Sequence, residues 1–156
     1  MEGLRQTGVK DFMKQIKISK LELFMIYKDI KKNICQHLEE YPPVKDLPSI
    51  LATLSQNNQL FVFSSNKKEA INAYLKKYKI DEYFSGIFED NSYFGKHVGL
   101  QKIVINQRLD PNNVYYIGDE TRDIAASKKA GIKSIAVTWG YAGDIPLSDA
   151  KPDYLS

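Results

Sequence analysis

Short apolar runs alternate with longer helical segments from residue 60 onward. This alternation restricts the fold of the chain more than any other feature. The apolar runs predict strands at 60–63, 86–88, 114–117 and 134–137, with one more at 154–155. Segments with helical spacing lie between them, at 67–78, 98–107 and 122–130. Short apolar strands separated by helices predict a parallel sheet with helices on both faces, in which 114–117 is buried. We therefore expect an α/β fold.

The chain up to about residue 40 has a different, helical pattern. Apolar residues recur there at three- and four-residue steps, from Leu23 to Leu38, and form one apolar stripe. A shorter helix is predicted at 9–16. Tyr41-Pro42-Pro43 ends this part, because proline cannot donate a hydrogen bond and restricts the residue before it. We expect a helical part at 1–43 and an α/β part at 44–156, which opens with another amphipathic helix.

Composition excludes several classes of protein. The 156 residues are one domain's length, and the pI near 8.8 comes from scattered lysine pairs with acidic residues between them. No nucleic-acid-binding motif accompanies this charge, so we expect no nucleic-acid partner. Lys10, Asp11 and Lys14 interrupt the early apolar residues, which argues against a signal peptide or membrane span. The single Cys35 cannot form an internal disulfide, so we expect a cytoplasmic protein.

Two aspartates follow the predicted strand at 114–117. Asp119 comes after the strand and Gly118, and Asp123 lies four residues later in the first turn of a predicted helix. Ligands bind at the carboxyl ends of strands in open α/β sheets. Two carboxylates there suit a divalent cation such as Mg²⁺, which shares its other positions with water and phosphate. The alternative is that both aspartates cap the helix and complement its positive end.

Ser64-Ser65-Asn66 follows the strand at 60–63 and precedes a predicted helix. Hydroxyl and amide groups beside the free N–H groups of a helix start are placed to hold an anion. The alternative is that Ser65 or Asn66 is simply the N-cap, and both interpretations can hold together.

Other polar and aromatic residues carry weaker signals. Lys96 follows Gly95 ahead of a helix and could present its charge to a phosphate, although most lysines in such a chain are simply solvated. Only two histidines, His37 and His97, are present, which gives little support for a histidine metal site. Around Gly140, we expect Trp139 and Tyr141 to pack against the protein rather than line a crevice.

The order of these groups resembles motifs two, three and four of the haloacid dehalogenase (HAD) superfamily of phosphatases. The segments at 118–132 and 136–140 look like the phosphoglycolate phosphatase branch of that superfamily. The similarity runs from about Tyr41 onward, and the helical front resembles the latter part of that branch's helical cap. The resemblance implies a Rossmann-like (HAD-like) core at 44–156 and a partial helical cap at 1–43.

The resemblance also implies an activity, Mg²⁺-dependent hydrolysis of a small phosphorylated metabolite. Asp119 would ligate the metal, and Asp123 would support it directly or through water. Ser64 would hydrogen-bond the transferring phosphoryl group, with the backbone at Ser65-Asn66 assisting. Lys96 would neutralise charge on the phosphate.

One motif of the family is absent from this sequence. Family members begin with a strand ending in Asp-x-Asp-Gly-Thr, whose first aspartate attacks phosphorus and whose second is the general acid and base. No Asp-x-Asp occurs among the 156 residues, so the nucleophile of covalent phosphoryl transfer is missing. In the family this strand lies between the strands that here end at Ser64 and Ile117. These two strands could pair directly, another segment could fill the gap, or the sequence is a piece of a longer protein.

We expect the last of these, a truncated phosphatase core that lacks its first strand and is inactive alone. The alternatives are a non-catalytic phosphate-binding or regulatory domain, and one half of a two-chain phosphatase. We expect no membrane partner, and the sequence indicates no particular oligomeric state.

Overall fold

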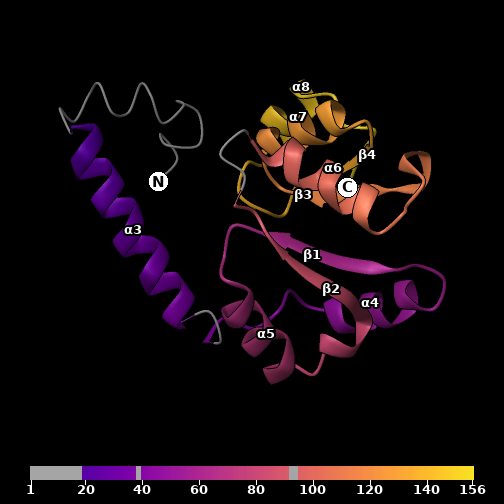
Figure 1. The fold of residues 1–156 in the computed structure, drawn as a ribbon, viewed down its shortest axis with the longest axis horizontal. Coiled ribbons are helices and arrows are strands. Elements are labelled where there is room, and N and C mark those ends of the chain that lie inside the picture. The colour runs from indigo at the N-terminus through magenta and orange to yellow at the C-terminus, as the bar shows by residue number, and fades with distance from the viewer. Residues whose placement is uncertain (1–18, 38–39, 92–94) are drawn as a thin grey trace. The chain divides into compact units, whose positions relative to one another are not determined.

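The computed structural model describes residues 19–37, 40–91 and 95–156 (Figure 1). Its contacts divide the described residues into two compact units, one that ends at Asp90 and one that begins at Asn91. We call them the N-terminal and C-terminal units. This division does not fall at residue 43, and the predicted boundary between a helical cap and an α/β core stays a prediction. The predicted helix at 9–16 lies outside the described residues.

The N-terminal unit contains a two-stranded parallel sheet. Phe61 pairs with Gly86, and Ser64 pairs with Glu89 at the carboxyl ends of the two strands. A core of four buried residues lies between this sheet and its helices: Leu51, Ile71, Leu75 and Ile80. The elements in chain order are α3 (Lys20–His37), α4 (Leu47–Ser55), β1 (Leu60–Ser64), α5 (Lys68–Lys77), η2 (Asp81–Tyr83) and β2 (Phe84–Glu89).

Helix α3 begins with a capping box. The backbone N–H of Glu22 donates to Ser19 Oγ over 3.2 Å, and the Ser19 N–H donates to Glu22 Oε2 over 3.0 Å. Two residues of the apolar stripe predicted from the sequence, Ile26 and Ile30, are exposed. Within the described ranges, the structure holds no helix with the length and apolar character that crossing a bilayer requires.

The C-terminal unit contains a three-stranded parallel sheet in the order β3-β4-β5. Helix α7 packs against β3 and β4 and against two neighbouring helices. The buried residues Ile124, Ala136 and Leu147 form the core of this packing. The elements in chain order are α6 (Lys96–Asn106), η3 (Pro111–Asn113), β3 (Tyr115–Gly118), α7 (Thr121–Ala130), β4 (Lys133–Ala136), α8 (Asp144–Asp149) and β5 (Tyr154–Leu155).

The predicted strands and helices of the α/β part are confirmed, usually within one or two residues. Gly131 ends α7 as its C-cap in the left-handed conformation, with φ of 75°, which glycine adopts at little cost. Helix α8 was not predicted, because it is only six residues long and contains Pro146.

One expectation about the strands needs correction. Tyr115 and Ile117 are 44% and 54% exposed, so β3 is not the fully buried strand that its apolar sequence suggested. In a strand, alternate side chains point to opposite faces, and Tyr115 and Ile117 share the face of β3 that is exposed. Among the described residues, β1 pairs with β2 in the N-terminal unit, and β3 pairs with β4 in the C-terminal unit.

We expect substitution of Ile124 by alanine to lower the free energy of unfolding by about 2–5 kcal/mol, because it leaves a cavity in a closed core. Ile124 is 2% exposed, whereas Ile105 on α6 is 72% exposed. The matched variant Ile105→Ala should change stability by no more than about 0.5 kcal/mol. Urea unfolding followed by circular dichroism measures both. Equal losses of unfolding free energy in the two variants would contradict the assignment of Ile124 to the core.

A second prediction concerns Asp153, which ties β5 to β4. The backbone N–H and the hydroxyl of Ser134 donate to Asp153 Oδ2 over 2.8 and 2.7 Å, and these bonds lower the pKa of the Asp153 carboxyl group. A carboxyl group whose pKa is lowered in the folded state stabilises the protein at pH values above the group's ordinary pKa. This contribution is lost as the pH falls through the folded-state pKa. Asp153→Asn should therefore show a shallower loss of stability below about pH 4 than the unmodified chain. Parallel acid unfolding curves for the two proteins would contradict the assignment.

Candidate metal and phosphate site

The turn between β3 and α7 positions the two aspartates. Asp119 follows the last residue of β3, and Asp123 is the third residue of α7, where it is 5% exposed. Asp123 belongs to a capping box: its Oδ2 accepts from the Glu120 N–H over 3.3 Å, and the Glu120 side chain accepts from the Asp123 N–H. The capping interpretation is thus right for Asp123. It is wrong for Asp119, because the N-cap is Glu120.

Asp123 also forms a buried ion pair with Lys96. Lys96 Nζ donates to Asp123 Oδ1 over 2.6 Å, and the two side chains are 18% and 7% exposed. The approach of Asp123 to the end of β3 needs Gly118, because a Cβ there would lie 2.5 Å from Asp123 Oδ2. Two of the residues named from the sequence are therefore brought into direct contact.

Tyr116 completes the surroundings of Lys96 and was missed by the sequence reasoning. Lys96 Nζ lies 3.2 Å from the Tyr116 hydroxyl and 5.5 Å from the ring centroid, within reach of a cation–π interaction. Alternation along β3 was the available signal, because Tyr116 points to the opposite face from Tyr115 and Ile117. Burial lowers the pKa of Lys96, but the hydrogen bond to Asp123 and the charge interactions with Tyr116 and Asp123 outweigh it, so the pKa of Lys96 is raised overall. Lys96 is therefore a firmly protonated cation at neutral pH.

Asp119 is held by the loop at 138–142, which follows β4. The Tyr141 N–H donates to Asp119 Oδ2 over 2.8 Å, and the Ala142 N–H donates to the Asp119 carbonyl oxygen over 3.1 Å. The side chains of Trp139 and Tyr141 are 61% and 55% exposed, so the prediction that they pack against the protein is wrong. The backbone of this loop makes the contact, and residue types alone do not reveal it.

The half-buried carboxylate of Asp119 fits a hard cation. Its Oδ2 is held by one N–H, and its Oδ1 makes no hydrogen bond with the described residues. Both oxygens of Asp123 accept hydrogen bonds, so Asp123 would reach a metal through water or after giving up one of these bonds. No three His, Cys, Asp or Glu side chains converge within the described parts of the chain. Mg²⁺ commonly takes one or two carboxylates and completes its shell with water and phosphate. Both assignments as metal ligands stay predictions.

The other predicted residues lie in the N-terminal unit, between β1 and α5. The half-buried Ser64 accepts a hydrogen bond at Oγ from the Asn66 N–H over 3.2 Å. Helix α5 has Lys67 at its N-cap position, without a side-chain cap, so neither Ser65 nor Asn66 is the N-cap. The roles of Ser64, Ser65 and Asn66 toward a phosphate stay predictions.

Glu89 is a second residue that the sequence reasoning missed. The N–H of Lys68, at the start of α5, donates to Glu89 Oε1 over 2.6 Å. The signal was the register of the parallel strands, which places Glu89 opposite Ser64 at the end of β2. An anion that approaches this helix start would compete with the Glu89 carboxylate, which already complements the helix dipole.

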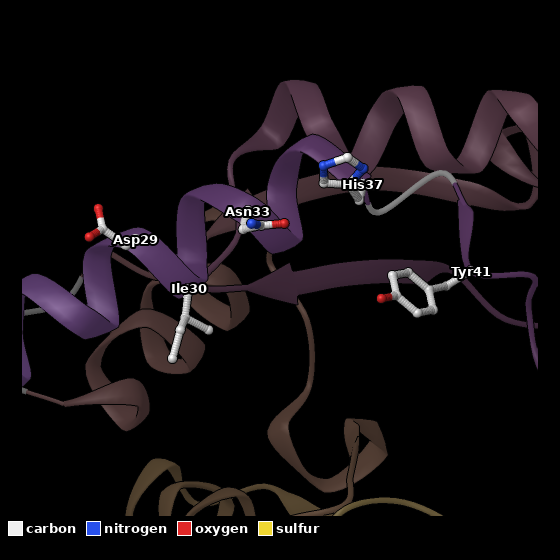
Figure 2. Close-up of a pocket in the computed structure, with 5 residues that line it drawn as sticks. All are labelled: Asp29, Ile30, Asn33, His37 and Tyr41. Atoms are coloured by element: carbon white, nitrogen blue, oxygen red, sulfur yellow. The ribbon is translucent and has the colours of Figure 1, made fainter.

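A separate hollow of about 340 Å³ lies beside α3 (Figure 2). Figure 2 shows four of its lining side chains along α3 and a fifth just beyond the helix. His37 Nδ1 in this hollow lies 2.8 Å from Glu40 Oε1. None of the residues predicted for the site lines it: the lining consists of Asp29, Ile30, Asn33, His37 and Tyr41.

We predict strong energetic coupling between Lys96 and Asp123. Lys96→Met and Asp123→Asn should each destabilise the chain, and the double variant should lose less than the sum, with a coupling of about 0.5–3 kcal/mol. The matched control is the pair of Arg122 and Glu120, 2.6 Å apart but 67% and 31% exposed, in the variants Arg122→Met and Glu120→Gln. Its coupling should stay below about 1 kcal/mol, because water screens an exposed pair. A double-mutant cycle of urea unfolding measures both, and additive losses at Lys96 and Asp123 would argue against the pair.

Comparison with known proteins shows the family to which the chain is similar. The family model described as haloacid dehalogenase-like hydrolase matches residues 1–137. A phosphoglycolate phosphatase of Synechococcus elongatus is 34% identical over 118 residues, which cover 76% of this chain and 55% of the relative. A phosphoglycolate phosphatase of Pasteurella multocida is 31% identical over 154 residues, which cover 96% of this chain and 66% of the relative.

A solved structure shares the fold. It is a haloacid dehalogenase-like hydrolase family protein of Streptococcus pneumoniae, with a TM-score of 0.78 and 22% identity over 98% of this chain and 73% of the other. Against the two phosphoglycolate phosphatases, the chain spans between about half and two thirds of their length. The chain belongs to the haloacid dehalogenase-like hydrolase family.

Proposed function

We propose that this chain supplies the metal- and phosphate-binding groups of a Mg²⁺-dependent phosphatase that acts on a small phosphorylated metabolite. The observation that carries the proposal is the ion pair of 2.6 Å between Lys96 Nζ and Asp123 Oδ1, because Asp123 comes four residues after Asp119 in the segment that follows β3. The similarity to phosphoglycolate phosphatases supports a small phosphate monoester as substrate. The single cysteine supports a reducing compartment, and we propose the cytoplasm.

Each residue has a chemical role in this proposal. When bound, Mg²⁺ would offset negative charge on the phosphoryl group. Asp119 would hold it with its carboxylate, whose Oδ2 also accepts from the Tyr141 N–H. Lys96 would present a fixed positive charge to phosphate oxygens, and its three N–H donors allow it to keep Asp123 while binding an anion. Ser64 accepts from Asn66, so its hydroxyl hydrogen is available to donate to a phosphoryl oxygen.

The same proposal limits what the 156 residues do alone. Positioned charges stabilise the transition state of phosphoryl transfer but do not replace an attacking group. No Asp-x-Asp occurs in this sequence, so we propose that the chain binds phosphate without turning over the ester. This proposal has three versions: a piece of a longer phosphatase, a stand-alone phosphate-binding or regulatory domain, and a phosphatase whose first motif comes from another chain. The first and third versions are favoured by β1 and β3, because each is the end strand of its sheet among the described residues and could take a further strand.

We predict that the chain binds inorganic phosphate in the presence of Mg²⁺, which calorimetry measures. Asp119→Ala or Lys96→Met should each weaken this binding about tenfold or more, which corresponds to at least about 1.4 kcal/mol. The matched control is Lys102→Met, which removes an exposed lysine from the same helix and should leave the affinity unchanged. Equal losses of affinity in the Lys96 and Lys102 variants would mean that phosphate binding depends only on net charge, and would contradict the proposal.

An assay with p-nitrophenyl phosphate and Mg²⁺ tests the catalytic part. We expect no measurable turnover from the chain alone, and turnover after addition of a peptide that carries an Asp-x-Asp-Gly-Thr strand if the enzyme has two components. Ordinary turnover by the chain alone, abolished in Asp119→Ala, would show that another residue attacks phosphorus.

A further inference from the structure

We propose that the loop at 138–142 is a positioning device for the metal-binding carboxylate, with Gly140 as its central residue. We call this segment the Asp119 loop. The inference rests on the proposed function, because it assigns to the loop the orientation of the ligand that the proposal gives to Mg²⁺. It adds a positioning residue, Gly140, which comes 21 residues after Asp119 in the chain and lies in a segment without a carboxylate.

The loop grips Asp119 at both its side chain and its main chain. The Tyr141 N–H donates to Oδ2 over 2.8 Å, and the Ala142 N–H donates to the Asp119 carbonyl oxygen over 3.1 Å. Two successive N–H groups therefore bind one residue. A carboxylate held in this way at one oxygen has lost much of its rotational freedom, so its second oxygen, Oδ1, is directed before any ligand arrives.

Gly140 allows the loop to come this close. A Cβ at Gly140 would overlap the Asp119 Cβ and would lie 2.5 Å from Oδ2. The atoms it would meet include the root of the Asp119 side chain, so a rotamer change at the far end of a flexible chain cannot relieve the overlap. Any residue other than glycine would therefore push Asp119 away from its present position or break the bond to the Tyr141 N–H.

Both ends of the Asp119 loop are anchored, which makes it a rigid support. At its start, the N–H and the hydroxyl of Thr138 both donate to the Ser156 carbonyl oxygen, over 3.0 and 2.7 Å. Just before it, the Val137 N–H donates to the Gly118 carbonyl oxygen over 3.0 Å. Beyond it, α8 is fixed by Leu147, which is fully buried in the core.

Trp139 makes the loop observable. It is the single tryptophan of the chain, it lies one residue before Gly140, and it is 61% exposed. Its indole N–H gives one assigned peak in a proton–nitrogen correlation spectrum. Mn²⁺, a paramagnetic substitute for Mg²⁺, broadens peaks of nearby N–H groups. Broadening of the Trp139 indole and the Tyr141 amide therefore measures metal at Asp119 without any need for catalysis.

We predict that Gly140→Ala raises the Mn²⁺ concentration for half-maximal broadening at least tenfold. Gly86→Ala is the matched control, since a Cβ at Gly86 meets only ordinary contacts at 3.4–3.5 Å, and it should shift this concentration less than twofold. Asp119→Asn should keep the Tyr141 hydrogen bond through its amide oxygen and lose the broadening, which separates loop geometry from metal binding. This combination of results supports the inference.

Two results would overturn it, and they differ in what they say about the proposed function. If Asp119→Ala abolishes the broadening while Gly140→Ala binds Mn²⁺ like the unmodified chain, the loop does not position the ligand and the metal site stands. If Asp119→Ala leaves the broadening unchanged, the metal assignment itself fails, and the inference with it.

Amide hydrogen exchange in the unmodified chain provides a second measurement if Gly140→Ala does not fold. The Tyr141 N–H should exchange at least tenfold more slowly than in Asp119→Ala. Equal exchange rates in the two proteins would show that the bond to Asp119 is not formed, and would also overturn the inference.

Discussion

The buried carboxylate of Asp123 is the interaction on which the rest of the candidate site depends. It completes the cap of α7, it neutralises Lys96, and it lies against the end of β3 where Gly118 leaves room for it. A buried carboxylate is costly unless its oxygens are bound, and here each oxygen has a donor. One side chain thereby links the sheet, the helix that packs on it, and α6, which carries the lysine. The capping and functional interpretations of Asp123 are two consequences of the same geometry.

The two aspartates of the site have different surroundings and therefore different chemistry. Asp123 is enclosed and its charge is balanced within the protein. Asp119 is half-buried, is held at Oδ2 by a backbone N–H, and makes no hydrogen bond through Oδ1 with the residues that the structure describes. An acidic pair four residues apart thus divides into a carboxylate paired with the Lys96 ammonium group and a carboxylate that we propose as a metal ligand. Because Lys96 donates to Asp123, its position is fixed without an ion pair to Asp119.

Particular residues show how far the sequence predicts this protein. Apolar runs and helical spacing located β1, β2, β3, β4, α5, α6 and α7, because buried faces require these periodicities whatever packs against them. The same reasoning failed at Ile117, which is apolar but exposed, and at Trp139 and Tyr141, whose side chains are also exposed. At Tyr141 it is the backbone N–H that binds Asp119. Helix α8 was too short to leave a periodic signal. The order of Ser64, Lys96, Asp119 and Asp123 indicated the family, which the match over residues 1–137 confirmed.

The sequence by itself determined the family and the alternation of strands and helices, and it supplied the candidate residues for binding a cation or a phosphate. These depend on residue type and on spacing along the chain. Only the tertiary structure decided which residues form hydrogen bonds with each other. Strand register and helix packing bring together three pairs of residues that lie far apart in the sequence. The separations are 27 residues for Lys96 and Asp123, 22 for Asp119 and Tyr141, and 21 for Lys68 and Glu89. A hydrogen bond depends on distance and direction in space, and no local pattern encodes the partner that folding brings from another element.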